Sequence, residues 1–326
     1  MRVYLALVLL LCVAAAASLL IGDGELSDAR LAPIFLGLRG ARLAAAFLAG
    51  AALAVAGVIV QGLFRNPLAD PSVLGTTAGA NLGGNVAMLL FDAFLGGAAA
   101  AYVAPELLLP LGCAAGAFVA LALLLVVQRV GDDLIVILLA GFLLGSLFAS
   151  TAGFVVSLAQ ERFELARAMM TFALGDLSGS GVRRIALAAP LVVVGVVAAW
   201  LWSRPLDLLL SGEEEAASLG VDVREVRHAC IVWTALLTAA AVSIGGSINF
   251  VGLIVPHAMR PFVGVSHRRL LPAAALAGGI FVVLCDALTR ALPTRSEMPL
   301  GVVTGLIGAP LFLVLLLRSR RELAHG

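Results

Sequence analysis

Apolar runs of about 20 residues recur along this chain, and short polar or basic segments separate them. A helix of that length crosses the hydrocarbon core of a bilayer, where only segments that satisfy their own backbone hydrogen bonds are stable. The 326 residues are 62% hydrophobic and 13% charged, whereas about a quarter of the residues in soluble domains are charged. We therefore predict an all-α, polytopic membrane protein with about ten transmembrane helices in one domain, residues 1–326.

The spans are expected at about residues 3–21, 42–62, 73–91, 106–127, 134–158, 185–202, 229–248, 250–265, 271–290 and 300–317. The first run is open to a second interpretation as a cleaved signal peptide, because small residues at 14–18 offer a cleavage site. Its length exceeds that of a usual signal-peptide core, which favours a retained helix. Residues 159–184 are too mixed in polarity to span, and we expect a short interfacial helix there.

The second run carries small residues and ends at a proline-broken corner. Small residues on related helix faces permit close helix packing, and four occur here: Ala46, Gly50, Ala54 and Gly57. Pro67 and Pro71 then remove backbone donors that a continuing helix would need. The segment from Gln61 to Pro71, with Arg65 and Asn66 inside it, is therefore expected to form a fixed corner that is buried in protein or faces water.

Composition excludes several functions. All 21 basic residues are arginine, so the chain lacks the lysine of a phosphate-binding loop, and any ATP must be bound by another subunit. The four cysteines stand singly in apolar runs, without metal-ligand spacing. A net charge of +1 gives no nucleic-acid signal, and no catalytic motif is present. We expect no metal, no cofactor bound by this chain, no nucleic-acid partner and no enzyme activity of its own.

The distribution of arginines predicts the orientation of the chain in the membrane. The basic turn at residues 266–269 and the basic tail at 318–321 favour cytoplasmic termini. Three further arginines, Arg39, Arg42 and Arg290, then lie at the outer mouth. Guanidinium groups suit carboxylates, so these three can receive acidic residues of a docking protein. The alternative is that they snorkel into lipid headgroups.

Two further pairs of polar residues fall within or beside apolar runs. Asp286 and Arg290 are four residues apart and can form an ion pair on one helix face, either structural or functional. His257 and Arg260 are three apart and follow Pro256, which would kink the helix. They are too few to ligate a metal, so we interpret them as structural residues near the inner surface, with a role in a pathway as the alternative.

The sequence GEEEAASLG at residues 212–220 resembles a short helix. Acidic residues suit its first turn, and Gly220 suits its end. Residue chemistry alone leaves two interpretations open, a docking helix for a cytoplasmic partner and a solvated loop.

Several motifs together carry a family resemblance along nearly the whole chain. They are QGLFRNPLADP at 61–71, Ser218-Leu219-Gly220, FVGLIVPH at 250–257 with Arg260, His267-Arg268, Leu271-Pro272, Asp286, EMPLG at 297–301 and GAPLF at 308–312. In this order and spacing they resemble the FecCD family, the permease subunits of type II ABC importers for iron–siderophore complexes, haem and cobalamin.

The resemblance implies a multi-pass protein of the bacterial inner membrane that forms a homodimer with a transport pathway on its axis. Two cytoplasmic ATPase subunits would bind ATP and Mg, and a periplasmic binding protein would deliver the cargo. The resemblance places the docking of that protein at Arg39, Arg42 and Arg290. One departure is Ala41, where the family often has proline, so the geometry before Arg42 can be looser.

The resemblance also assigns residues 212–227 as the element that couples the permease to the ATPase. The coupling residues are expected to be Glu213, Glu214, Glu215, Ala216, Ser218, Leu219 and Gly220.

The cargo is expected to be haem or a ferric siderophore, with cobalamin as the alternative. Arg167, Met169 and Met170 near the outer mouth would suit a flat apolar ring with carboxylates, although methionines also serve as interface packing. A secondary transporter or channel that works without an ATPase is the competing function, but such proteins usually carry ionisable groups near the membrane midplane.

Overall fold

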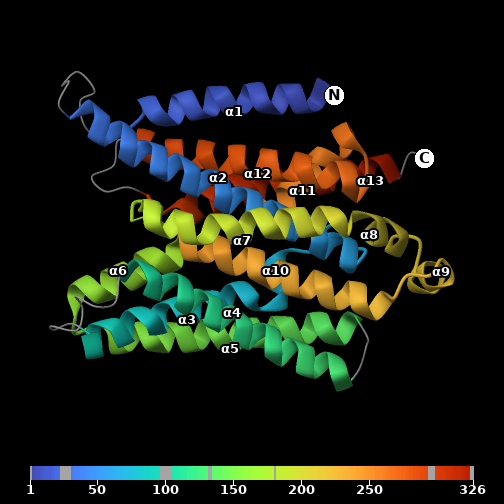
Figure 1. Cartoon of the computed structure of the whole chain (residues 1–326), viewed down its shortest axis with the longest axis horizontal. Helices are drawn as coiled ribbons and strands as arrows, with labels where there is room; N and C mark the ends of the chain where they lie inside the picture. The colour runs from blue at the N-terminus through green and yellow to red at the C-terminus, as the bar shows by residue number, and fades with distance from the viewer. Residues whose placement is uncertain are drawn as a thin grey trace.

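The computed structural model describes residues 2–22, 31–95, 105–130, 134–179, 181–292 and 298–323, and all the regular secondary structure in these ranges is helical (Figure 1). Ten helices coincide with the ten predicted spans: α1 (Arg2–Leu20), α2 (Ala32–Leu63), α3 (Thr76–Leu90), α4 (Pro105–Val130), α5 (Leu134–Leu158), α7 (Val182–Leu201), α10 (Val223–Gly245), α11 (Val251–Val263), α12 (His267–Ala291) and α13 (Leu300–Leu323). Within the described ranges, seven are long and apolar enough to cross a membrane; α3, α11 and the apolar part of α13 are shorter. The predicted all-α membrane fold is confirmed.

Three further short helices do not span. They are α6 (Phe163–Leu174), α8 (Ser203–Leu209) and α9 (Glu213–Ser218), and two single-turn elements, η1 (Pro71–Leu74) and η2 (Phe91–Leu95), flank α3. Figure 1 shows α8 and α9 at the same end of the bundle as the start of α1 and the end of α13, whereas α6 lies at the opposite end. We call these the α9 end and the α6 end. The chain therefore begins and ends its described part at the α9 end.

Two boundaries differ from the sequence prediction. Helix α2 begins at Ala32 rather than at about residue 42, because Pro33 occupies its first turn, where a missing N–H costs nothing. Arg39 therefore lies inside the helix instead of preceding it, and Arg42 lies within the helix instead of at its start. Helix α10 begins at Val223 rather than at about residue 229, and the Asp222 carboxylate caps it by accepting the Glu225 N–H at 3.0 Å. The last part of the predicted coupling loop, 212–227, is thus a helical turn.

Helices α2, α10 and α12 form the buried centre, while α1, α4, α5 and α7 expose most of their apolar surface. The small residues of α2 create this arrangement. A Cβ on Gly50 would overlap the Gly278 carbonyl of α12, and a Cβ on Gly57 would overlap the Gly252 carbonyl of α11. Backbones approach to contact at both points, as the small-residue spacing predicts.

The predicted corner after α2 has a defined hydrogen-bond pattern. Arg65 has the left-handed φ of 48°. Its N–H donates to the Gly62 carbonyl at 3.2 Å, and the Asn66 N–H donates to the Gln61 carbonyl at 3.1 Å. This is a Schellman ending, and Pro67 follows where the helix cannot continue. The corner is thus fixed by its own backbone.

Candidate functional site

A cavity of about 790 Å³ lies between α3, α5 and α6. Its walls are Ser72, Thr77, Ala78, Asn81, Asn85, Phe142, Gly145, Ser146, Ala149, Ala152, Gly153, Val156, Ser157, Gln160, Met170, Ala173, Leu174 and Ser247. None of these lining residues carries a formal charge. The cavity is therefore mostly apolar, with alcohol and amide groups as its polar contacts.

Helix α5 makes room for this cavity with small side chains. Gly145, Ala149 and Gly153 recur every four residues, so they lie above one another on one face of the helix. A Cβ on Gly153 would meet no atom within 4 Å. These residues were not among the predicted site residues, although their spacing matches that of the small residues in α2.

A chain of buried amides follows α3 along the cavity wall. The Asn85 side-chain N–H donates to the Asn81 Oδ1 at 2.9 Å, and the Asn81 N–H donates to the Ser247 hydroxyl at 2.9 Å. Asn85 is fully buried, so its amide depends on protein partners rather than water. These contacts orient Asn81 and Ser247, which both line the cavity.

The three residues predicted to line a pathway separate in the structure. Met170 lines the large cavity. Met169 is fully buried and packs with Val155 and Ala159, because successive helical residues point about 100° apart. Arg167 lines a second cavity of about 410 Å³, whose walls also carry Glu164, Asp176 and Arg184.

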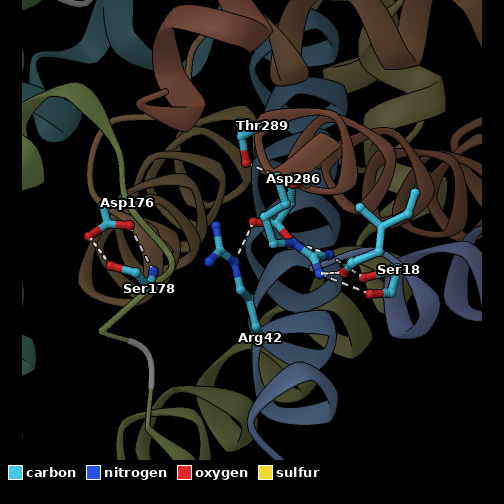
Figure 2. Close-up of polar contacts among 8 residues, drawn as sticks. Ser18, Arg42, Asp176, Ser178, Asp286 and Thr289 are labelled. Atoms are coloured by element: carbon cyan, nitrogen blue, oxygen red, sulfur yellow. Dashed lines mark hydrogen bonds and ion pairs between the residues drawn. The ribbon is translucent and has the colours of Figure 1, made fainter. Parts of the chain in front are cut away.

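The three arginines predicted for docking lie together at the α6 end, and two of them, Arg42 and Arg290, contact one carboxylate. Arg42 Nε donates to Asp286 Oδ1 at 2.8 Å, and Arg290 Nη2 lies 3.0 Å from Asp286 Oδ2. Asp286 is fully buried. The predicted i,i+4 pair of Asp286 and Arg290 is confirmed, and Arg42 joins it from α2 (Figure 2).

Arg39 and Arg290 also bind the end of α1, whose last carbonyls have no partner within the helix. Arg39 donates to the Leu19 and Gly22 carbonyls at 2.8 and 2.9 Å. Arg290 donates to the Ser18 carbonyl and hydroxyl at 2.9 and 2.8 Å, and also to the Ile21 carbonyl. Cations favour a helix C-terminus. Both arginine residues are buried against protein, which argues against snorkelling into lipid headgroups.

A cavity of about 470 Å³ adjoins this arginine cluster, which we define as Arg39, Arg42 and Arg290. Its opposite wall is the turn around Ser178. Figure 2 shows the terminal nitrogens of Arg42 directed toward the space before the Asp176–Ser178 turn. Asp176 accepts hydrogen bonds from the N–H and hydroxyl of Ser178 at 2.7 and 2.5 Å. The cluster thus borders a hollow large enough to admit a carboxylate side chain.

The motif residues near the corner connect α2 to α11. Gln61 donates through Nε2 to the Gly252 and Leu253 carbonyls at 3.1 and 3.3 Å. Its Oε1 accepts a hydrogen bond from Arg260 at 2.6 Å. Pro256 lies within α11, and His257 Nδ1 has no partner among the described residues. Arg260 therefore has the structural contact that we expected, while these contacts assign no partner to His257.

The remaining corner residues form tight local turns. Asn66 accepts the Leu68 N–H through its side chain at 2.9 Å, and Asp70 accepts the Ser72 N–H at 2.9 Å. Pro71 is buried against Gly252 of α11. Backbone N–H groups of Leu68, Ala69 and Ser72 in this non-helical stretch therefore have local partners, which favours a broken backbone near lipid.

The predicted short helix at the α9 end is confirmed as α9. Glu213 at its start pairs with the buried Arg227 of α10 at 2.8 Å, and Ala216 is fully buried beneath it. Its other predicted coupling residues are exposed: Glu214, Glu215, Ser218, Leu219 and Gly220. Gly220 has a left-handed φ of 85° at the helix end, as predicted.

Comparison with known proteins identifies the same family over most of the chain. A model of the FecCD transport family matches residues 4–318. The chain is 40% identical to the cobalamin import system permease protein BtuC of Halobacterium salinarum, over 82% of this chain and 69% of that protein. It is 37% identical to the hemin transport system permease protein HmuU of Yersinia pestis, over 89% of this chain and 84% of that protein.

A solved structure of an ABC transporter has the same fold as this chain. The chain superposes with a TM-score of 0.85 and 31% identity on a protein described as a metal-chelate type ABC transporter in an inward-facing conformation. The alignment covers 97% of this chain and 99% of that one. This multi-pass membrane protein therefore belongs to the FecCD transport family and is a permease subunit of an ABC importer.

Proposed function

We propose that this permease moves a bulky metal chelate through the 790 Å³ cavity between α3, α5 and α6. The single observation that carries the proposal is that this cavity is large and that none of its lining residues is charged. A fixed charge would bind a passing ligand tightly or exclude it, whereas conduction needs binding that is weak enough to release.

The pathway is completed by a second copy of the chain. Helix α5, which forms one wall of the cavity, exposes large apolar side chains along its length, including Ile135, Phe142 and Phe154. Lipid is one possible covering for such a face. A homodimer contact is supported by its continuity with the cavity, because a pathway wall must be closed on its open side.

The partners occupy opposite ends. Two ATPase subunits, which bind ATP and Mg, dock at the exposed residues of α9, and the α9 end with both termini faces the cytoplasm of the bacterial inner membrane. A periplasmic binding protein docks at the α6 end. The arginine cluster and its 470 Å³ hollow support this assignment, since a carboxylate reaching Arg42 would find a cationic, partly desolvated pocket.

The cargo is haem or a ferric siderophore, with cobalamin as the second candidate. One relative of this chain is named for cobalamin import and another for hemin transport. Met170 supports an apolar ring, but Arg167 lies outside the large cavity and offers no partner there for haem carboxylates. The amides of Asn81 and Gln160 equally suit a corrinoid with neutral amide side chains. Uptake assays with hemin, cyanocobalamin and ferric dicitrate distinguish these candidates.

A bulky substitution tests the cavity. Ala149→Trp fills the α5 wall and should lower uptake at least tenfold in liposomes that also contain the ATPase and binding protein, because the ligand can no longer pass. Val193→Trp, on the exposed face of α7 and outside the cavity, is the matched control and should retain uptake within about twofold. Equal uptake by both variants would contradict a pathway through this cavity.

A neutral substitution tests docking. Arg42→Gln should weaken binding-protein affinity about tenfold and make it less sensitive to salt, because a charge pair in a partly buried hollow is lost. Arg183→Gln, an exposed arginine at the start of α7 that does not line the hollow, controls for the general loss of positive charge. Titration at two salt concentrations measures both effects, and unchanged affinity in Arg42→Gln would remove the docking assignment.

A further inference from the structure

The first turn of α12 is capped by a residue from another helix. Asp207 of α8 accepts hydrogen bonds from the Ser266 hydroxyl at 2.8 Å, the His267 N–H at 2.7 Å and His267 Nδ1 at 2.7 Å. Ser266 makes no cap bond with its own helix. Burial raises the pKa of Asp207, but the hydrogen bonds from His267 and Ser266 outweigh it and hold that pKa below its ordinary value. The anionic carboxylate therefore stabilises a helix start 60 residues further along the chain.

Helix α8 is in turn joined closely to α9. Only three residues separate them, the last of which is Gly212 with a φ of 130°. Leu206 and Leu209 anchor α8 in the core, and Glu213 ties the start of α9 to Arg227. The connection between α8 and α9 is therefore short, and each helix is fixed by its own contacts.

His267 brings a third helix to the same point. Its side chain is 3% exposed, and it lies against Gly62 in the last turn of α2. A Cβ on Gly62 would stand 3.1 Å from His267 Cε1 and 3.3 Å from Leu206 of α8. Helices α2, α8 and α12 thus meet at this imidazole, next to Gln61.

The opposite end of α12 carries the other polar connection. Asp286 and Arg290 bind Arg42 of α2 and the end of α1 there. At 1.5 Å per residue, the 25 residues of α12 span about 38 Å. One continuous helix therefore has a polar attachment to α8 at one end and to the arginine cluster at the other.

We propose that Asp207 and His267 are positioning residues that couple α9 to α12. When the ATPase subunits displace α9, the Asp207–His267 contact carries the movement into α12 and on to the arginine cluster at the α6 end. This inference rests on the proposed function, because it assigns α9 to the ATPase. The Asp207–His267 contact lies outside the coupling segment, residues 212–227, and transmits the displacement of α9 toward the opposite side of the membrane.

The test compares two contacts to the first turn of α12 in the complete complex of permease, ATPase and binding protein in liposomes. Asp207→Ala removes the contact from α8, whereas the control Tyr4→Phe removes a hydrogen bond from α1, in which the Tyr4 hydroxyl donates to the Arg269 carbonyl at 2.7 Å. The measured quantity is cargo taken up per ATP hydrolysed, with hemin, cyanocobalamin or ferric dicitrate as the probe, whichever the wild type transports. We expect Asp207→Ala to lower this ratio at least fivefold, with ATP hydrolysis within twofold of wild type, and Tyr4→Phe to leave the ratio unchanged.

Two more variants make the result decisive. Asp207→Asn keeps an acceptor oxygen and should restore part of the ratio. Ser266→Ala removes only one of the three hydrogen bonds, so it should fold even if Asp207→Ala does not, and should lower the ratio about twofold. A wild-type ratio in Asp207→Ala or Ser266→Ala, or a proportional loss of uptake and hydrolysis, would overturn the coupling role. Absence of ATP-dependent uptake by the wild-type complex would instead contradict the proposed function, and this inference with it.

Discussion

Asp286 places a carboxylate in the protein interior, where a lone charge is strongly unfavourable. Two guanidinium groups compensate it, Arg42 at 2.8 Å and Arg290 at 3.0 Å. Arg290 and Arg39 are in turn held by carbonyls at the end of α1. Because the Asp286 carboxylate holds Arg42 and Arg290 in place, its loss should destabilise the whole arginine cluster.

Asp286→Asn should destabilise the protein by about 3–5 kcal/mol, because it removes the buried carboxylate that the Arg42 and Arg290 guanidinium groups both contact. Thermal unfolding in detergent measures the effect. Glu214→Gln, an exposed acidic residue of α9, should change stability by less than about 0.5 kcal/mol. If Asp286→Asn lost no more stability than Glu214→Gln, the ion pairs of Asp286 would contribute little to the stability of the fold.

For single residues, the sequence predicts contacts between neighbours on one helix but not contacts between distant helices. The i,i+4 spacing of Asp286 and Arg290 was sufficient to predict their contact. Arg42, their third partner, lies 244 residues from Asp286 in sequence, and no spacing rule connects the two. The burial of Arg39 follows from unpaired carbonyls at the end of α1, which only the folded arrangement reveals.

The same small-residue pattern serves two opposite purposes in different helices. In α2, Gly50 and Gly57 allow backbones of α12 and α11 to touch. In α5, Gly145, Ala149 and Gly153 leave space that becomes part of a cavity. Apolar run length therefore predicted nearly every helix, but periodicity alone could not say whether a small-residue face meets a neighbour or an opening.

A pair of glycine substitutions in α2 tests the packing role. Alanine is favoured over glycine in a helix by about 1 kcal/mol, so Gly40→Ala, where an added Cβ meets no atom within 4 Å, should be neutral or stabilising. Gly57→Ala should destabilise in spite of that preference, because its Cβ overlaps the Gly252 carbonyl. Thermal unfolding of the two variants side by side would contradict this explanation if both gained stability.

Across the whole molecule, the functional features divide between the two ends and the wall between them. The arginine cluster lies at the α6 end, the exposed face of α9 at the other, and the uncharged cavity opens beside α5. Motif order predicted the family from the sequence, and the docking and coupling roles assigned to the two ends stay predictions. Of the cavity lining, Met170 was predicted from the sequence, but the other lining residues were not, because none of the quoted motifs contains them.

The most direct test of an ATP-driven importer permease is uptake by liposomes with each component supplied or omitted. The probes are hemin, cyanocobalamin and ferric dicitrate, and accumulation inside the vesicle is measured. We predict that one probe accumulates only when permease, ATPase subunits, binding protein and ATP are all present, and that omission of the ATPase reduces uptake to background. Uptake at the full rate by the permease alone would contradict the account and identify a channel or secondary transporter instead.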